Sequence, residues 1–165
     1  MRVKEYISGG NTRCVQAAFR MIVLAFIGVD PGQEKADRMT GFVEGRGTWQ
    51  FRMLLSLAEY GLFVIDHEQF DVNEFLSTPE HAIRRQVGDE EAAQDIIEET
   101  DIDSEQKALN ECVKSPFVTF IETVPSMAEL EEQVNKKRLV MVNVNRKVLQ
   151  KENGREGHIL ILEKI

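Results

Sequence analysis

The feature that most constrains the fold is an apolar stretch near the start of the chain, CVQAAFRMIVLAFIG, which runs from Cys14 to Gly28. Its residues are apolar on nearly every face of a helix, and a helix of that kind is normally buried at the centre of a protein. Asn11 or Thr12 can cap its N-terminus with a side-chain oxygen, and Gly28 is suited to end it. The sequence therefore predicts a central helix around which the rest of the chain packs.

Turn signals and apolar spacing predict further helices and strands. The helices are expected from about Pro31 to just before Gly41, from Thr48 to Gly61, and from a capping box at Ser126 and Glu129 to about Lys137. Strands are expected over residues 62–66, 118–122, 139–145 and 158–165. A polar loop with an Asn-Gly turn signal separates the last two strands, which are therefore expected to pair as antiparallel neighbours. Helices first and an antiparallel sheet after them form an α+β arrangement.

The length of 165 residues suits one domain, and no repeat or linker divides residues 1–165. The one shift in composition is a strongly acidic stretch around residues 86–112. We expect a helical excursion there, with one buried side anchored by Ile96, Ile97 and Leu109. The alternative is an acidic rim that receives a basic substrate.

Charge and composition exclude several classes of function. The net charge of −8 argues against nucleic acid as a partner, because phosphate binding needs a positive surface. The longest apolar run, Met21 to Ile27, is too short to span a membrane, and the N-terminus lacks the apolar core of a signal peptide. Two distant cysteines are expected to be reduced thiols in a cytoplasmic protein. No metal-ligand cluster, phosphate loop or nucleotide fingerprint occurs, so neither a metal nor a cofactor is expected.

Cys14 is a candidate nucleophile because of its place in the chain. It falls in the first turn of the predicted central helix, where unpaired amides and the helix dipole stabilise an anion such as a thiolate. Arg13 beside it adds positive charge. A cysteine nucleophile also needs a base within hydrogen-bond reach. Among three histidines, His158 is the best candidate, because it follows Gly157 and opens the last strand; the alternative is a histidine that faces solvent at a strand start.

Two other residues have structural interpretations. Cys112 has acidic neighbours, which raise the pKa of a thiol, so we interpret it as a structural cysteine. Trp49 follows the glycine-flanked loop EGRG, residues 44–47. It is expected to anchor the start of a helix, although this loop could also line a cleft.

Four stretches, in this order, resemble the C39 peptidase-like proteins, a branch of the papain-like cysteine peptidases. They are CVQAAFRMIVLAFIG, GTWQFRMLLSLAEYGLFV, PSMAELEEQVNKKRLVMVNVN and GHILILE, and they span most of the chain except the acidic stretch. The resemblance implies a papain-like fold, in which the N-terminal helix packs on a late antiparallel sheet. It also implies a thiol peptidase, or a related acyl-transfer hydrolase, that acts on a peptide or protein with Cys14 as nucleophile and His158 as base.

The chain departs from the family pattern after and before the cysteine. Val15 and Gln16 stand where the family usually has Gly-Pro, and Ser8 stands where it usually has a glutamine for the oxyanion hole. These departures favour an alternative, a catalytically degenerate papain-like domain that binds a peptide or a partner protein. A related hydrolase with a non-peptide substrate is a third possibility, because a fold does not fix a function.

Asparagines are the candidates for the missing supporting residues. Asn11 is the nearest amide to Cys14 that could help to hold an oxyanion. The family orients its histidine with a residue from a following strand, whereas the sequence here ends at Ile165, seven residues after His158. If the last two strands pair, Asn143 or Asn145 lies beside His158 and could orient the imidazole instead.

Overall fold

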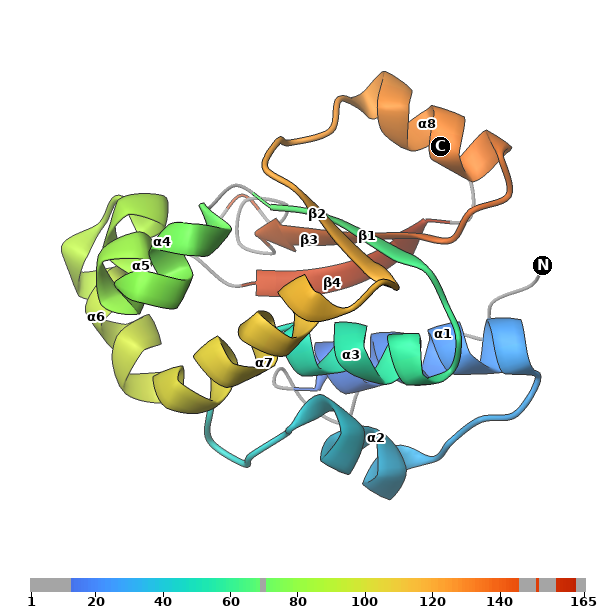
Figure 1. Cartoon of the computed structure of the whole chain (residues 1–165), viewed down its shortest axis with the longest axis horizontal. Helices are drawn as coiled ribbons and strands as arrows, with labels where there is room; N and C mark the ends of the chain where they lie inside the picture. Colours follow the sequence, from blue (N-terminus) through green and yellow to red (C-terminus); the bar gives the residue numbers. More distant parts are fainter. Residues whose placement is uncertain (1–12, 69–70, 146–150, 152–156, 163–165) are drawn as a thin grey trace.

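The structure is a computed structural model that describes residues 13–68, 71–145, 151 and 157–162. Helices and strands are both present, so the fold is of the α+β type (Figure 1). The helices are α1 (Cys14–Ile27), α2 (Gln33–Thr40), α3 (Phe51–Glu59), α4 (Val72–Ser77), α5 (Pro79–Val87), α6 (Glu90–Glu99), α7 (Ile102–Lys114) and α8 (Met127–Asn135). The strands are β1 (Val64–His67), β2 (Val118–Ile121), β3 (Val140–Asn145) and β4 (Gly157–Leu162).

The ends of α1 show which local signals the chain obeys. Gly28 ends the helix in the left-handed conformation, with φ of 82°, and its amide donates to the Leu24 carbonyl, as the sequence predicted. The predicted caps are wrong, because the N-cap residue is Arg13, whose side chain makes no capping hydrogen bond. Asn11 and Thr12 lie outside the described residues.

The burial of α1 is uneven along its length. Its first ten residues supply core side chains, of which Phe19 is fully buried, whereas Phe26 and Ile27 are each 44% exposed. A helix that is apolar all round was expected to be buried throughout. The expectation is wrong for the last turn, because α2 and α3 pack against α1 but leave this end uncovered.

Within the described residues, the strands form two separate sheets of two strands each. β3 and β4 are antiparallel, with Val140 opposite Leu162, which confirms the predicted pairing. β1 and β2 are parallel, with Val64 opposite Val118, so the prediction of one antiparallel sheet is wrong for this pair. A parallel pair needs a long crossover between its strands, and the four helices α4 to α7 supply it here.

The acidic stretch forms the end of α5, all of α6 and most of α7. Helices α4, α5 and α6 cluster at one end of the molecule, and α7 leads back beneath the strands to lie beside α3 (Figure 1). On α7, Ala108, Leu109 and Cys112 are buried against the core. Most acidic residues of α7 therefore lie on its outer side, whereas Glu105 is buried on the side that packs in the interior.

An aromatic cluster joins the N-terminus of α3 to α4. The Trp49 ring stacks on Phe51 with centroids 5.7 Å apart, and it lies 5.1 Å from the ring of Phe75. Its indole nitrogen donates to the Thr100 hydroxyl at 3.1 Å. These contacts confirm the interpretation of Trp49 as an anchor, and they fix the loop that precedes α3.

Candidate functional site

Cys14 is the first residue of α1, in agreement with its expected place in the first helical turn. No acidic residue lies in that turn, and the N-cap side chain accepts no hydrogen bond from its amides. The positive end of the helix dipole is therefore not offset by a carboxylate of its own turn. The Cys14 side chain is half-buried and packs against the core.

Arg13 contributes less positive charge than the sequence suggested. Its guanidinium forms an ion pair with the Asp37 carboxylate of α2 and lies 4.1 Å from the centre of the Phe42 ring. Asp37 also accepts a hydrogen bond of 2.6 Å from the Gln33 amide. The positive charge of Arg13 is thus neutralised by Asp37, which is distant in the sequence and lies next to Arg13 only in the folded chain.

The strand that contains His158 packs against the helix that begins with Cys14, since α1 and β4 are in contact. Ile159 and Ile161 of β4 lie against the core that α1 helps to form. In the β3–β4 ladder, His158 is opposite Val144 and Asn145 is opposite Gly157. The backbone therefore brings together the two elements that hold the predicted dyad.

The structure says less about the asparagines that were predicted to support the dyad. Asn143 is exposed and lies opposite Ile159. The side chains of Asn145 and His158, and the whole of Asn11, lie outside what the structure describes. Their roles stay predictions.

Gln16, one of the departures from the family pattern, is a core residue. It is fully buried, and its amide nitrogen donates to the Thr40 hydroxyl at 2.8 Å. That hydroxyl donates in turn to the Ala36 carbonyl at 2.9 Å, so the chain of hydrogen bonds fastens α1 to α2. Val15 is also buried. The two residues after Cys14 thus serve packing.

Cys112 is fully buried in α7, and its thiol donates to the Phe51 carbonyl at 3.3 Å. Burial, together with the smaller effect of the charges of Asp66 and Glu111, raises the pKa of the Cys112 thiol to about 12. The interpretation as a structural cysteine is confirmed. Its main cause differs from the expected one, because desolvation outweighs the acidic neighbours.

The two remaining histidines, His67 and His81, are exposed and belong to elements other than α1 and β4. His67 ends β1, where its Nδ1 is 3.3 Å from the Thr123 carbonyl. His81 lies on the surface of α5, with its Nδ1 2.7 Å from a carboxylate oxygen of Glu74.

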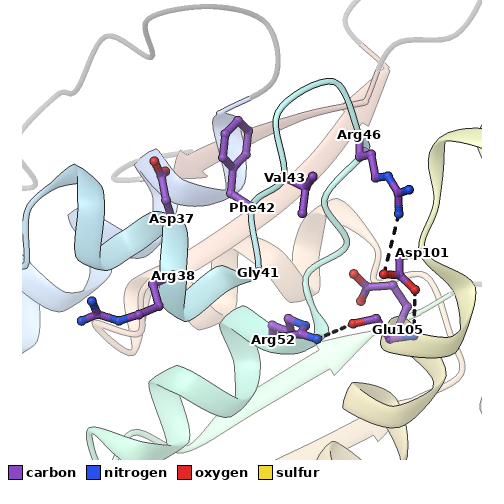
Figure 2. A pocket seen from close by; sticks show the side chains of 11 residues that line it. Asp37, Arg38, Gly41, Phe42, Val43, Arg46, Arg52, Asp101 and Glu105 are labelled. Atoms are coloured by element: carbon purple, nitrogen blue, oxygen red, sulfur yellow. Dashed lines mark hydrogen bonds and ion pairs between the residues drawn. The ribbon is translucent and has the colours of Figure 1, made fainter.

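A cavity of about 240 Å³ lies between α2, the 41–50 loop, α3 and the N-terminus of α7 (Figure 2). Arg46 and Gly47 of the EGRG loop line this cavity, which does not include Cys14 and so is not the cleft of the predicted dyad. Arg52 of α3 and Glu105 of α7 approach each other at its inner side (Figure 2). Sequence reasoning did not single out this pair.

Glu105 is the least expected member of the cavity, because it is an ionisable side chain with only 6% exposure. Burial raises the pKa of this carboxyl to about 7, with Asp101 adding to the rise and Arg52 opposing it. A signal existed in the sequence. Glu105 lies at helical spacing from Ala108 and Cys112, and so on the face that α7 turns to the core.

Asp66 on β1 is a second carboxyl on an inward face. Burial raises its pKa to about 6, while hydrogen bonds with Glu68 and Gln50 act in the opposite direction. Alternation along the strand places Asp66 on the same side as Val64, so this position was also readable from the period of two.

Among the described residues, no group of three or more His, Cys, Asp or Glu side chains could hold a metal ion. Within the same residues, none of the helices has the length and apolar character needed to cross a membrane. Comparison of the chain with models of protein families, with curated proteins and with solved structures gives no match.

Proposed function

We propose that the protein is a thiol-dependent acyl-transfer hydrolase of the papain-like class, similar to the C39 peptidases, with Cys14 as nucleophile and His158 as base. The observation that carries the proposal is the packing of α1, which begins with Cys14, on β4, which contains His158. A Cys-His dyad needs such a pairing, with the thiol at a helix N-terminus and the imidazole on a strand packed against it.

The proposed chemistry follows from these roles. His158 takes the proton of the Cys14 thiol, and the sulfur attacks the carbonyl carbon of a peptide bond. Amides at the N-terminus of α1 hold the oxyanion, and Asn11 is the candidate side chain that assists them. The amine leaves with the proton from His158, and water then cleaves the thioester by the same steps in reverse order. Asn145, opposite Gly157, is the candidate that orients the imidazole.

A second candidate function is a papain-like domain that binds a peptide without cleaving it. The ion pair between Arg13 and Asp37 favours it, because the pair removes positive charge from the neighbourhood of the thiol. The burial of Gln16 acts in the same direction, since this side chain is bonded to Thr40 and is not available to a substrate.

A peptidyl aldehyde or a peptidyl epoxide distinguishes the two functions. The hydrolase should be modified at Cys14, located by mass spectrometry, and His158→Ala should slow the modification by about tenfold or more, because general-base assistance is lost. His81→Ala is the matched control, since His81 is an exposed histidine on α5, and it should leave the rate unchanged. Slow modification that is indifferent to His158→Ala would favour the binding domain and overturn the hydrolase.

A further inference from the structure

The cavity beside Glu105 contains an acceptor that the described part of the chain leaves without a partner. Glu105 is only 6% exposed, and its Oε2 atom is buried with no hydrogen-bond partner among the described residues. A buried carboxyl oxygen without a donor is costly, so such an atom points to a ligand that supplies the donor. Figure 2 shows the Glu105 side chain between Asp101 and Arg52.

The other acidic groups of the cavity already have cationic partners. Asp37 is paired with Arg13, and the Asp101 carboxylate lies 3.7 Å from the guanidinium of Arg46. Glu105 is therefore the carboxyl on which a ligand's donor would act.

Arg52 provides the complementary group. Its guanidinium donates one hydrogen bond to the Ser104 hydroxyl, which leaves further N–H groups of its five for an acceptor. Gly41 permits this position of the side chain, because a Cβ atom at residue 41 would collide with the Cδ atom of Arg52. A carboxyl oxygen that lacks a hydrogen-bond donor and a guanidinium with N–H groups to spare thus line the same cavity.

These charges select the class of ligand. A simple cation would be attracted by Glu105 but repelled by Arg46 and Arg52, and a simple anion would meet the reverse. A zwitterion satisfies both at once. The cavity of about 240 Å³ is far larger than one water needs and smaller than the sites of drug-sized ligands.

We propose that this cavity binds a small zwitterion of the free amino acid type, with its ammonium group on Glu105 and its carboxylate on Arg52 and Arg46. The cavity does not include Cys14, so the site does not depend on the proposed hydrolase activity. Phe42 and Val43 line the cavity from the 41–50 loop and provide apolar contact for a side chain of the ligand.

The test is a thermal-shift screen of the L-amino acids at millimolar concentration, followed by calorimetric titration of the one that shifts Tm most. Methylamine, acetate and acetamide serve as the cationic, anionic and neutral fragments. We expect an amino acid to bind and the fragments to bind at least about tenfold more weakly, because each makes only part of the contacts. Binding of no amino acid, or equal binding of one fragment, would overturn the proposal.

Variants locate the site. Glu105→Gln should weaken binding by about tenfold or more, since it removes the charged acceptor. Arg46→Gln, a change at a half-exposed side chain, should weaken it severalfold. Glu111→Gln alters an exposed glutamate of the same helix and should leave the affinity unchanged. An affinity that neither Glu105→Gln nor Arg46→Gln alters would place the amino acid elsewhere and contradict the assignment.

Discussion

The N-termini of α1 and α7 each border a candidate site, but they differ in the charge that they already carry. At α1, no acidic residue lies in the first turn and the N-cap side chain makes no capping hydrogen bond. At α7, the Asp101 side chain accepts a hydrogen bond of 3.2 Å from the Ser104 amide, and Asp103 and Glu105 follow in the first turn.

Both helix ends have the same dipole, so the difference comes from the side chains. The first turn of α1 contains no acidic side chain that offsets the positive end of its dipole. At the end of α7, the carboxylates of Asp101, Asp103 and Glu105 already offset the positive end of the dipole. A ligand that binds there must therefore supply a hydrogen-bond donor. The comparison shows that every helix N-terminus has a positive field, whereas the side chains around it determine which ligand charge can bind there.

The largest expected effect contrasts the thiols of the two helices. The rise of the Cys112 pKa from 9.0 to about 12 lowers its thiolate fraction about a thousandfold at a given pH. Iodoacetamide should therefore label Cys112 at least about a thousandfold more slowly in the folded protein than in denaturant. Cys14, half-buried at a helix start, should label without denaturant. Equal labelling of the two thiols in the folded protein would contradict the comparison; Cys14→Ser provides a chain in which only Cys112 reacts.

The next largest effect concerns Glu105 and pH. Its pKa is raised from 4.5 to about 7, so between these values the unfolded chain has lost a proton that the folded chain retains. Stability should therefore fall as the pH rises through this window. Glu105→Gln removes the titration and should raise the free energy of unfolding by about 3 kcal/mol above pH 7 and much less near pH 4.

Urea unfolding at several pH values measures this difference. Glu111→Gln is the control on the exposed side of α7 and should change the stability little at any pH. A gain from Glu105→Gln that is the same at acidic and neutral pH would show that the Glu105 carboxyl does not titrate in this window.

A smaller effect tests the capping of α7 directly. Asp101→Ala removes the side chain that accepts from the Ser104 amide, and it should lower the free energy of unfolding by about 1 kcal/mol. Asp103→Ala changes an exposed carboxylate of the same turn that is not the cap, and it should cost only a few tenths of that. Equal losses in the two variants, measured by urea unfolding, would remove capping as the distinction between the two helix ends.

The smallest effect is expected at the entrance to α1. The Arg13 and Asp37 side chains are 30% and 24% exposed, so their ion pair should contribute about 0.5 to 1 kcal/mol. Arg13→Gln, Asp37→Asn and the double variant form a cycle that isolates this coupling. The coupling should shrink in high salt. If it is absent at low salt as well, Arg13 is available to add its charge to the field at Cys14.

Features that depend on neighbours in the sequence were predictable. Gly28 ends α1 because a residue without Cβ adopts the left-handed conformation at little cost. The capping box at Ser126 and Glu129 starts α8, because both hydrogen bonds join residues three apart. The antiparallel pairing of β3 and β4 follows from a single connecting loop. In each case the partners are close along the chain, so local preferences were enough.

Features that join distant segments were decided by the tertiary structure. β1 pairs in parallel with β2, although four helices separate the two strands in the sequence, and no sequence pattern predicted this pairing. Asp37 came to lie on Arg13, which changed the expected charge at Cys14. Glu105 became a buried carboxyl in a cavity because α3 and the 41–50 loop cover it. Packing brings these groups together, and desolvation and Coulomb interactions act only after it has done so. A sequence pattern therefore named the candidate thiol, whereas only the fold determined which charges surround it.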